Sequence, residues 1–368
     1  MRERLKSKMI VSVIAAVFFP LAAWCMSKAP DEYSDSERRV LAASPELTLE
    51  SVLSTDFMTD FEDYATDQFP LRDSFRKLKS TTEFHIFHKM DNNGLYYRRG
   101  HLCKMEYPLN TAMLDHAAER FFYLYEAYMQ GTDVNIYFGI VPDKNMYLAG
   151  ESGHLAMDYD ALADYMQERT TYMEYIDLYD MLSIDDYYKT DTHWKQECIV
   201  DVAEKIAACM GVTLEAGYTE NVLAHPFYGV YYGQALLDVD ADALTYLTND
   251  VLAACKVTSY DTGMPKEVPL YDMDAAAGKD PYEMFAAGSD ALITIENPGA
   301  ETERELVIFR DSFASSLAPL LVDGYSKITL VDIRYVQSAM LGNFIDFDNQ
   351  DVLFLYSTLL LNDSLAMK

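Results

Sequence analysis

Short apolar segments that alternate with helical patterns constrain the fold of this chain more than any other feature. Each segment is largely apolar over five to eight residues, without the alternating polar face of a half-exposed strand. The clearest examples are VNIYFGIV (134–141), ELVIF (305–309), KITLVDI (327–333) and DVLFLYS (351–357). Because strands that alternate with helices form parallel sheets between helical layers, the pattern predicts a three-layer α/β sandwich with a mostly parallel sheet.

The segments between these strands carry the helical patterns. Helices are predicted over residues 111–130, 158–174 and 194–211. The last of them has a continuous apolar face and stops at Gly211. Further strands are predicted at 175–182, where the pattern is weaker, and at 291–296. Residues 213–290 fit the alternation poorly, and we interpret them as a candidate insertion in an α/β domain that spans 107–368.

The N-terminus has the pattern of a membrane-targeting segment. Lysines and arginines at positions 2, 4, 6 and 8 precede an uncharged apolar run of 18 residues, 9–26. The run is short for a membrane span and long for a cleaved signal. We favour an uncleaved anchor over residues 1–27, with its basic end cytoplasmic and the main domain outside, because a cut after Ala23 would place the bulky Leu21 at a position that needs a small residue. A cleaved signal peptide, which would make the protein secreted, is the alternative.

Residues 28–106 join this segment to the α/β domain. The part from 28 to 44 is polar and is interpreted as a stalk. Residues 45–90 show helical periodicity that Pro70 interrupts, so two amphipathic helices are expected. The turn dipeptide Asn93-Gly94 introduces the extended segment LYYRRGHL, which predicts a short hairpin.

Composition and charge exclude several classes of protein. Half of the residues are apolar and 24% are charged, which is incompatible with a disordered or fibrous chain. The 59 acidic residues against 29 basic ones give a formal charge of −30, and so negative a surface repels phosphate backbones, so we expect no nucleic acid partner. The five cysteines include no CxxC pair, and no HxH or HExxH motif occurs, so neither a metal site nor another cofactor is predicted.

One serine stands where an open α/β sheet gathers its ligands, at the carboxyl end of a strand. The strand 305–309 is followed by Arg310, Asp311 and Ser312, and then by a helical segment. A serine between a strand and a helix has its hydroxyl lifted out of the sheet, and the free amides of the helix N-terminus stabilise an oxyanion. The alternative is that Asp311 or Ser312 only caps the helix, which taken alone is the more common role.

A second candidate group is the pair Asp191 and His193, in the segment YYKTDTHWK. In an extended segment, residues two apart point to the same side. Asp191 can then accept a hydrogen bond from Nδ1 of His193, which leaves Nε2 to take the proton of Ser312. The alternatives are a helix cap beside a surface histidine, or a metal site, although no second histidine lies nearby in the sequence.

Together these features resemble a known family. DTHW followed far downstream by a strand and DSF resembles the DHHW family, which is similar to periplasmic alginate O-acetylation proteins with SGNH-hydrolase-like domains. The resemblance covers roughly residues 35–368 and includes ERRVLAASPELTLES, NNGLYYRRGHL and FYGVYYG. It implies a flavodoxin-like three-layer domain with a catalytic triad of Asp191, His193 and Ser312, in the chain order of the alginate-type proteins.

The chain departs from the SGNH signature at one position, and the resemblance does not identify every group that donates a hydrogen bond to the oxyanion. The SGNH signature places Gly before Asp-Ser, whereas this chain has Arg310, which either narrows the turn or adds positive charge near the oxyanion. Candidates for further hydrogen-bond donors to the oxyanion are the backbone amide of Gly229 or Gly233 and the side chain of Asn145 or Asn362. No motif in the sequence distinguishes among them.

Two more residues are candidate substrate contacts. The ring of Tyr228 can stack on a sugar face, although core packing explains most aromatic residues of such a chain equally well. Arg334 follows a predicted strand, where it can hold a substrate anion or an acyl carbonyl, and Lys144 has a similar position. A structural ion pair is the alternative for Arg334.

The resemblance and the candidate triad together predict an extracytoplasmic acyl-transfer enzyme. It would be an O-acetyltransferase or acetylesterase that acts on a cell-surface or exported polysaccharide, through an acyl-enzyme on Ser312. The resemblance further implies that a membrane-bound O-acyltransferase partner supplies the acetyl groups. The alternative, from a different class, is a catalytically inactive, surface-anchored glycan-binding or scaffold protein, which the Arg310 departure favours.

Overall fold

The structure is a computed structural model that describes residues 2–34, 36–215 and 217–368. Contacts divide the chain into two compact units. The first unit comprises Met1–Asn92 and Tyr232–Asp238, and the second comprises Asn93–Tyr231 and Val239–Lys368. The short helix α9 (Val230–Ala235) crosses the division between them.

An eight-stranded sheet is the centre of the second unit, with strand order β10-β9-β11-β13-β12-β14-β5-β6. Neighbouring strands from β13 through β12, β14 and β5 to β6 pair in parallel, whereas β11, β9 and β10 extend the sheet antiparallel. The strands are β5 (Asn135–Val141), β6 (Glu174–Ile176), β9 (Lys256–Ser259), β10 (Lys266–Val268), β11 (Leu292–Glu296), β12 (Glu305–Arg310), β13 (Lys327–Val331) and β14 (Asp351–Ser357). The predicted mostly parallel sheet is confirmed.

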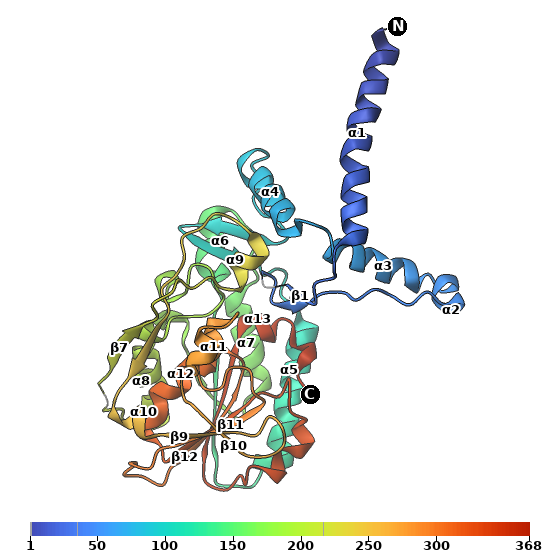
Figure 1. Ribbon diagram of the computed structural model, residues 1–368. Helices are drawn as coiled ribbons and strands as arrows, with labels where there is room; N and C mark the ends of the chain where they lie inside the picture. Colours follow the sequence, from blue (N-terminus) through green and yellow to red (C-terminus); the bar gives the residue numbers. More distant parts are fainter. Residues whose placement is uncertain (1, 35, 216) are drawn as a thin grey trace. The chain divides into compact units, whose positions relative to one another are not determined.

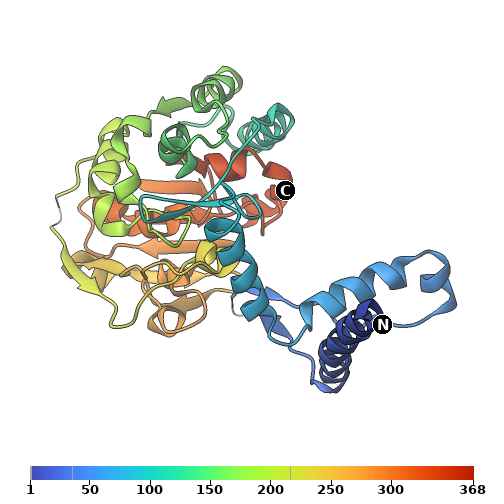
Figure 2. The same ribbon diagram turned by 90° about the horizontal axis from the view of Figure 1, so that it is seen from above.

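Helices cover both faces of this sheet, as Figures 1 and 2 show. One face packs against α8 (Val200–Cys209) and α12 (Phe313–Leu321), and the other against α5 (Thr111–Leu124) and α7 (Tyr159–Arg169). Strand β12 shows why its sequence has no polar face: Leu306 and Ile308 point into the first helical layer, whereas Val307 and Phe309 point into the second. The predicted three-layer sandwich is therefore confirmed.

Shorter elements complete the second unit. Asn93 and Gly94 adopt left-handed backbone conformations just before a hairpin, as their sequence predicts. The hairpin consists of β3 (Leu95–Arg98) and β4 (His101–Lys104). The shorter elements also include α6 (Asn145–Ser152), β7 (Thr219–Val222), β8 (Thr245–Thr248), α10 (Asp250–Ala254), α11 (Met273–Ala276), α13 (Thr358–Leu361) and the 3-10 turn η5 (Pro281–Met284).

Two segments differ from their sequence patterns. The segment predicted as a strand at 175–182 forms only the three-residue β6 and then a 3-10 turn, because its tyrosines and leucines suit either conformation and only an edge position is available. The candidate insertion, 213–290, contributes β9 and β10 to the central sheet. Their short, half-buried runs resemble loop sequence, because an antiparallel edge needs fewer apolar residues than a buried parallel strand.

The first unit begins with one long apolar helix, α1 (Arg2–Ser27). Within it, Lys6–Ser27 contains an 18-residue window with a mean hydropathy of 2.3 that is not buried in the structure, and the helix is long enough to cross a membrane. An apolar N-terminal helix of this kind fits a signal-anchor. The other elements are β1 (Tyr33–Ser34), β2 (Arg39–Val40), α2 (Leu49–Leu53), α3 (Asp56–Asp67) and α4 (Arg72–His85).

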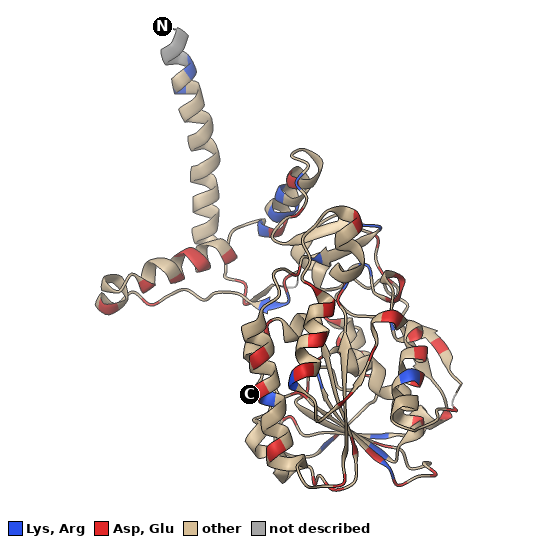
Figure 3. Ribbon diagram, turned by 180° about the vertical axis from the view of Figure 1, so that it is seen from behind, with Lys and Arg blue, Asp and Glu red and all other residues tan. Residues whose placement is uncertain are grey.

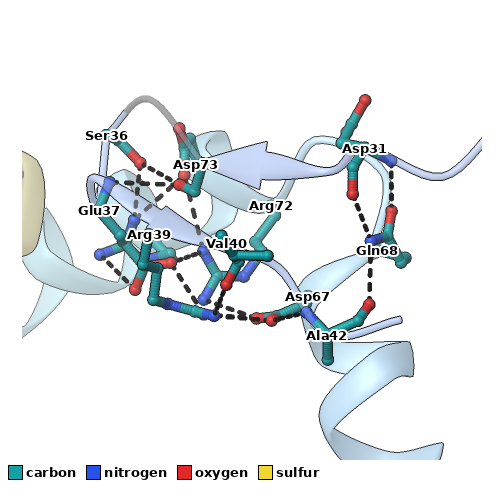
Figure 4. A network of polar contacts seen from close by, with 12 residues as sticks. Asp31, Ser36, Glu37, Arg39, Val40, Ala42, Asp67, Gln68, Arg72 and Asp73 are labelled. Atoms are coloured by element: carbon teal, nitrogen blue, oxygen red, sulfur yellow. Dashed lines mark hydrogen bonds and ion pairs between the residues drawn. The ribbon is translucent and has the colours of Figure 1, made fainter. Parts of the chain in front are cut away.

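A polar network connects the segment after α1 to the junction of α3 and α4 (Figure 4). Asp67 accepts two hydrogen bonds from the Arg39 guanidinium, at 2.5 and 2.8 Å, which hold the pKa of Asp67 down to about 2. The side chain of Gln68 accepts from the amide of Asp31 and donates to its carbonyl, both at 2.8 Å. The network therefore holds residues 31–34 and 36–42 against the ends of both helices.

Candidate active site

Ser312 lies at the carboxyl end of β12, directly before α12. Its hydroxyl makes no capping bond to the helix. The neighbouring carboxylate takes that role, because Oδ1 of Asp311 accepts from the amide of Phe313 at 3.0 Å and Oδ2 accepts from the amide of Ser357 at 2.8 Å. Of the two residues that could cap this helix, Asp311 does so, and Ser312 directs its hydroxyl elsewhere.

Hydrogen bonds join Ser312, His193 and Asp191 in a row. Oγ of Ser312 lies 2.7 Å from Nε2 of His193, and Nδ1 of His193 lies 2.6 Å from Oδ1 of Asp191. A carboxylate only accepts hydrogen bonds, so Nδ1 carries the proton and Nε2 is left to accept the proton of the serine hydroxyl. The structure thus brings together three side chains that are 119 and 2 residues apart in the sequence.

The loop that carries Asp191 and His193 is tightly fixed. An antiparallel bridge between Tyr187 and Trp194 closes the loop at its base. The buried carboxylate of Asp242 then accepts three hydrogen bonds from the loop: from the amides of Lys189 and Thr190, each at 2.8 Å, and from the Thr190 hydroxyl at 2.6 Å. Such a loop holds the imidazole in one position with little loss of entropy during a reaction.

Gly229 lies against the back of Asp191. A Cβ atom added to Gly229 would lie 2.2 Å from Cβ of Asp191, so only glycine allows this approach. The close contact lets the next amide, that of Val230, donate to Oδ2 of Asp191 at 2.8 Å. The amide of Gly229 itself donates to the hydroxyl of Thr190 at 2.9 Å, so in this structure it supports the loop. Gly233, the other candidate amide, belongs to the first unit.

An aromatic residue that the sequence did not single out packs on His193. The ring of Tyr282 stacks on the imidazole with centroids 3.8 Å apart and planes 7° apart. The Tyr282 hydroxyl forms a 2.9 Å hydrogen bond with Oγ of Ser316 on α12, which fixes the ring. Tyr282 lies in η5, inside the candidate insertion, and no motif there pointed to the site.

Solved structures share this architecture. A DHHW family protein from Eubacterium siraeum superposes with a TM-score of 0.57 at 20% sequence identity, over 74% of this chain and 93% of that one. Bacillus cereus PatB1 superposes with a TM-score of 0.57 at 18% identity, over 73% of this chain and 97% of PatB1. The chain has the fold of these two proteins. The predicted resemblance to a DHHW protein is thus confirmed for the fold.

Further comparisons add three findings. PatB1 with a sulfonyl adduct superposes with a TM-score of 0.55 at 18% identity, over 73% of this chain and 95% of PatB1. The O-acetyltransferase domain of Pseudomonas putida AlgJ superposes with a TM-score of 0.41 at 11% identity, over 73% of this chain and 92% of that domain. No protein-family model and no curated protein sequence matches the chain.

Arg310, which replaces the glycine of the SGNH signature, is completely buried. Its guanidinium donates to Oγ of Ser315 at 3.0 Å and to the carbonyls of Gly288 and Asp290 at 3.0 and 3.1 Å. These carbonyls belong to a strained loop in which Ala286, Ala287 and Gly288 are consecutive left-handed residues. Burial lowers the pKa of Arg310 from its ordinary value, and the side chain ties this loop to α12.

The other candidate residues have partners of their own. Arg334 forms a two-pronged ion pair with Asp332, at 2.9 and 2.6 Å, which is the structural arrangement considered from the sequence. The side-chain oxygens of Asn145 and Asn362 accept from the Tyr96 hydroxyl and from the amide of residue 110, at 2.9 and 2.7 Å. Tyr228 is 42% exposed beside Gly229, so its ring remains accessible to a ligand.

Lys144 is a buried cation beneath the loop of the triad. Its ammonium group donates to the carbonyls of Tyr188 and Lys189, at 2.9 and 3.3 Å, and lies 5.1 Å from the ring centre of Tyr231. Burial lowers the pKa of Lys144 to about 8. The charge therefore supports the backbone that leads to Asp191, at a cost in solvation.

Replacing Lys144 with methionine is expected to change how stability depends on pH. An unfolded lysine holds its proton up to about pH 10.4, so above pH 8 the unfolded chain binds a proton that the folded chain lacks. The free energy of unfolding of the wild type should therefore receive a contribution that rises by roughly 3 kcal/mol between about pH 8 and 10.4. This contribution should be absent from Lys144→Met.

Urea unfolding across this pH range measures the effect. Lys205→Met is the matched control, because Lys205 is exposed on α8 and its removal should leave the pH dependence as in the wild type. Parallel pH curves for the wild type and Lys144→Met would show that folding does not lower the pKa of Lys144.

Proposed function

We propose that this protein is an extracytoplasmic acyl-transfer enzyme that acts on acetyl esters of a cell-surface or exported polysaccharide. The observation that carries the proposal is the row of two short hydrogen bonds, 2.7 Å from Ser312 to His193 and 2.6 Å from His193 to Asp191. A buried carboxylate, an imidazole and a hydroxyl in this order form a proton relay that activates a serine.

The geometry supports a two-step mechanism. Oγ of Ser312 attacks the acetyl carbonyl while Nε2 of His193 takes its proton, and Asp191 stabilises the imidazolium that forms. The tetrahedral intermediate expels the donor alcohol, which takes the proton from Nε2 and leaves an acetyl group on Ser312. An acceptor hydroxyl then gives its proton to Nε2 of His193 and attacks the acyl-enzyme, and the bond from Oγ to the acyl carbon breaks as His193 returns the proton to Oγ, which regenerates the serine. A sugar acceptor makes the reaction a transfer and water makes it a hydrolysis.

The apolar N-terminal helix and the fold support the proposed membrane anchoring and the acyl-enzyme mechanism. The apolar helix α1 would anchor the protein in the cell membrane and leave the α/β unit outside, where polysaccharide is found. A membrane-bound O-acyltransferase would supply the acetyl groups. The adduct reported for PatB1 makes a sulfonyl electrophile a suitable probe for a chain of the same fold.

Mass spectrometry of the full chain tests the proposal directly. A sulfonyl fluoride and an activated acetyl ester should each add one group to the peptide that contains Ser312, and Ser312→Ala should remain unmodified. An intact but unmodified Ser312 in both experiments, together with no release of acetate, would reject the enzyme in favour of the inactive glycan-binding alternative.

The stacked ring of Tyr282 gives a second prediction for the same site. Tyr282→Leu is expected to lower kcat about tenfold, because the imidazole loses the flat surface that orients it. Tyr282→Phe keeps the ring and loses the bond to Ser316 and the long bond to the carbonyl of Ser312, so its kcat should stay within about threefold of the wild type. Steady-state rates on an acetyl ester measure both variants, and equal losses in both would mean that stacking is unimportant.

A further inference from the structure

One segment of this acidic protein is basic. Residues 72–90, which comprise α4 and the five residues after it, contain five lysines and arginines and two acidic residues, a net charge of +3 against −30 for the whole chain. The preceding helix in the same unit, α3, contains five acidic residues and no basic one. Figure 3 shows this contrast as blue on α4 and red on α3.

The two sides of α4 have different environments. One side is held by polar contacts within the first unit: Arg72 pairs with Glu37 at 2.5 Å, and Arg76 donates to the carbonyl of Gly233 at 3.1 Å. An adjacent side exposes 46% of Phe75 and 61% of Leu78. The apolar exposure continues after the helix at Ile86, Phe87 and Met90.

Lysines border this apolar stripe. In a helix each residue turns by about 100°, so Lys77 and Lys79 lie on opposite sides of Leu78. Both lysines are exposed. Long basic side chains beside an apolar stripe are typical of helices that lie in a membrane interface, where the ammonium groups reach the headgroups and the apolar residues enter the acyl boundary.

The segment is also tied to the region next to α1. Gln68, three residues before the N-cap of α4, holds both backbone groups of Asp31, which is four residues beyond the end of α1. Four residues span at most about 14 Å. If α1 crosses the membrane, α4 is therefore kept near the lipid surface at a high effective concentration, and a weak affinity for lipid is sufficient.

We propose that α4 and residues 86–90 bind an anionic lipid surface beside the anchor. The inference rests on the membrane anchoring of α1 proposed above, and it is independent of the triad. A span and a basic amphipathic segment would act as two signals that hold the first unit on the membrane. An anionic lipid surface fits the lysine-bordered stripe better than a protein partner does. The positive charge of the segment favours anionic headgroups, and its connection to the end of α1 keeps it next to the membrane.

Tryptophan quenching by brominated lipid tests the proposal in the full chain. The natural tryptophans are Trp24, in α1, and Trp194, which is completely buried in the second unit. In a Trp24→Phe background, Leu78→Trp reports on α4 and Met58→Trp, on the acidic α3, is the matched control. The unaltered chain reports on α1 through Trp24.

The expected results distinguish the lipid contact of α4 from the membrane anchoring of α1. In vesicles of mixed phosphatidylcholine and phosphatidylglycerol, Leu78→Trp should lose roughly half of its added emission, since interfacial helices enter the acyl boundary. The loss should be several-fold smaller in phosphatidylcholine alone, which has no net charge, or after Lys77→Gln and Lys79→Gln remove two positive charges from the segment, because either change removes the electrostatic attraction. Met58→Trp should not be quenched in either lipid.

Three outcomes would overturn the proposal. Quenching of Trp24 without quenching of Leu78→Trp would leave the anchor in place and reject the lipid contact of α4. A blue shift of Leu78→Trp without quenching would indicate a protein surface, either a second copy or a partner. An unquenched Trp24 would reject the anchor and the lipid contact of α4 with it, while the triad mechanism would be unaffected.

Discussion

Replacing Ser312 with alanine is expected to lower kcat for an activated acetyl ester by a factor of about 10⁴ to 10⁶. Oγ of Ser312 is the atom that forms the covalent bond in the proposed mechanism. The next two hydroxyls on α12 are already engaged, since Ser315 accepts from Arg310 and Ser316 accepts from Trp194. The loss should therefore fall on kcat, with KM changed little.

Asp191→Asn should cost about 10³- to 10⁴-fold in kcat while the fold is retained. Asp191 accepts from Nδ1 of His193 through Oδ1 and from the amide of Val230 through Oδ2. An asparagine has one acceptor oxygen, so it satisfies only one of these donors and turns its NH₂ group toward the other. If the NH₂ group faces the imidazole, His193 must adopt the wrong tautomer to accept from it.

A serine at the other end of the sheet is the control for both variants. Ser326 precedes β13, and its hydroxyl donates to the carbonyl of Arg304 at 2.8 Å. Ser326→Ala should keep kcat within about twofold, because it perturbs packing without touching the relay. A Ser312→Ala enzyme that keeps more than about a tenth of the activity would contradict the covalent mechanism.

The sequence predicts those parts of this fold in which local pattern and tertiary environment agree. Strands β12 and β14 are covered by helices on both faces, so their residues are apolar without alternation, and the pattern predicts both the strand and its burial. The pair Asp191 and His193 was predictable for a similar reason, because the spacing of two residues already places both side chains on one side of an extended loop.

The rest of the site depends on contacts between distant segments. Tyr282 reaches His193 from a segment 89 positions later in the chain, through packing that leaves no local pattern. The burial of Lys144 under the loop and the three bonds accepted by Asp242 likewise arise only when the sheet is assembled. Arg310 shows the converse, because its difference from the glycine of the SGNH signature was visible in the sequence but its contacts with the 286–290 loop were not.

Gly229 is the residue at which the smallest change is expected to disturb the site most. Gly229→Ala would place Cβ 2.2 Å from Cβ and 2.4 Å from Cα of Asp191, and neither atom is the flexible end of a side chain. The loop must therefore move, and a displacement of about 1 Å at the reacting groups costs on the order of 10²-fold in rate. We expect kcat to fall by at least this factor and the free energy of unfolding to fall by about 1–3 kcal/mol.

Steady-state kinetics and thermal unfolding measure these two effects, with Gly150→Ala as the control. Gly150 lies inside α6, and a Cβ there meets no atom within 4 Å, so alanine should leave kcat unchanged. A Gly229→Ala enzyme with normal kcat would show that Asp191 tolerates displacement and that its position is not important for the rate.

A double-mutant cycle separates displacement of Asp191 from general damage to the fold. If Gly229→Ala acts by moving the carboxylate away from Nδ1 of His193, it should cost far less activity in an Asp191→Asn background, where that hydrogen bond is already compromised. If it acts by loosening the α/β unit as a whole, its cost should be the same in both backgrounds. We expect the first result, because the three atoms nearest to an added methyl group all belong to Asp191.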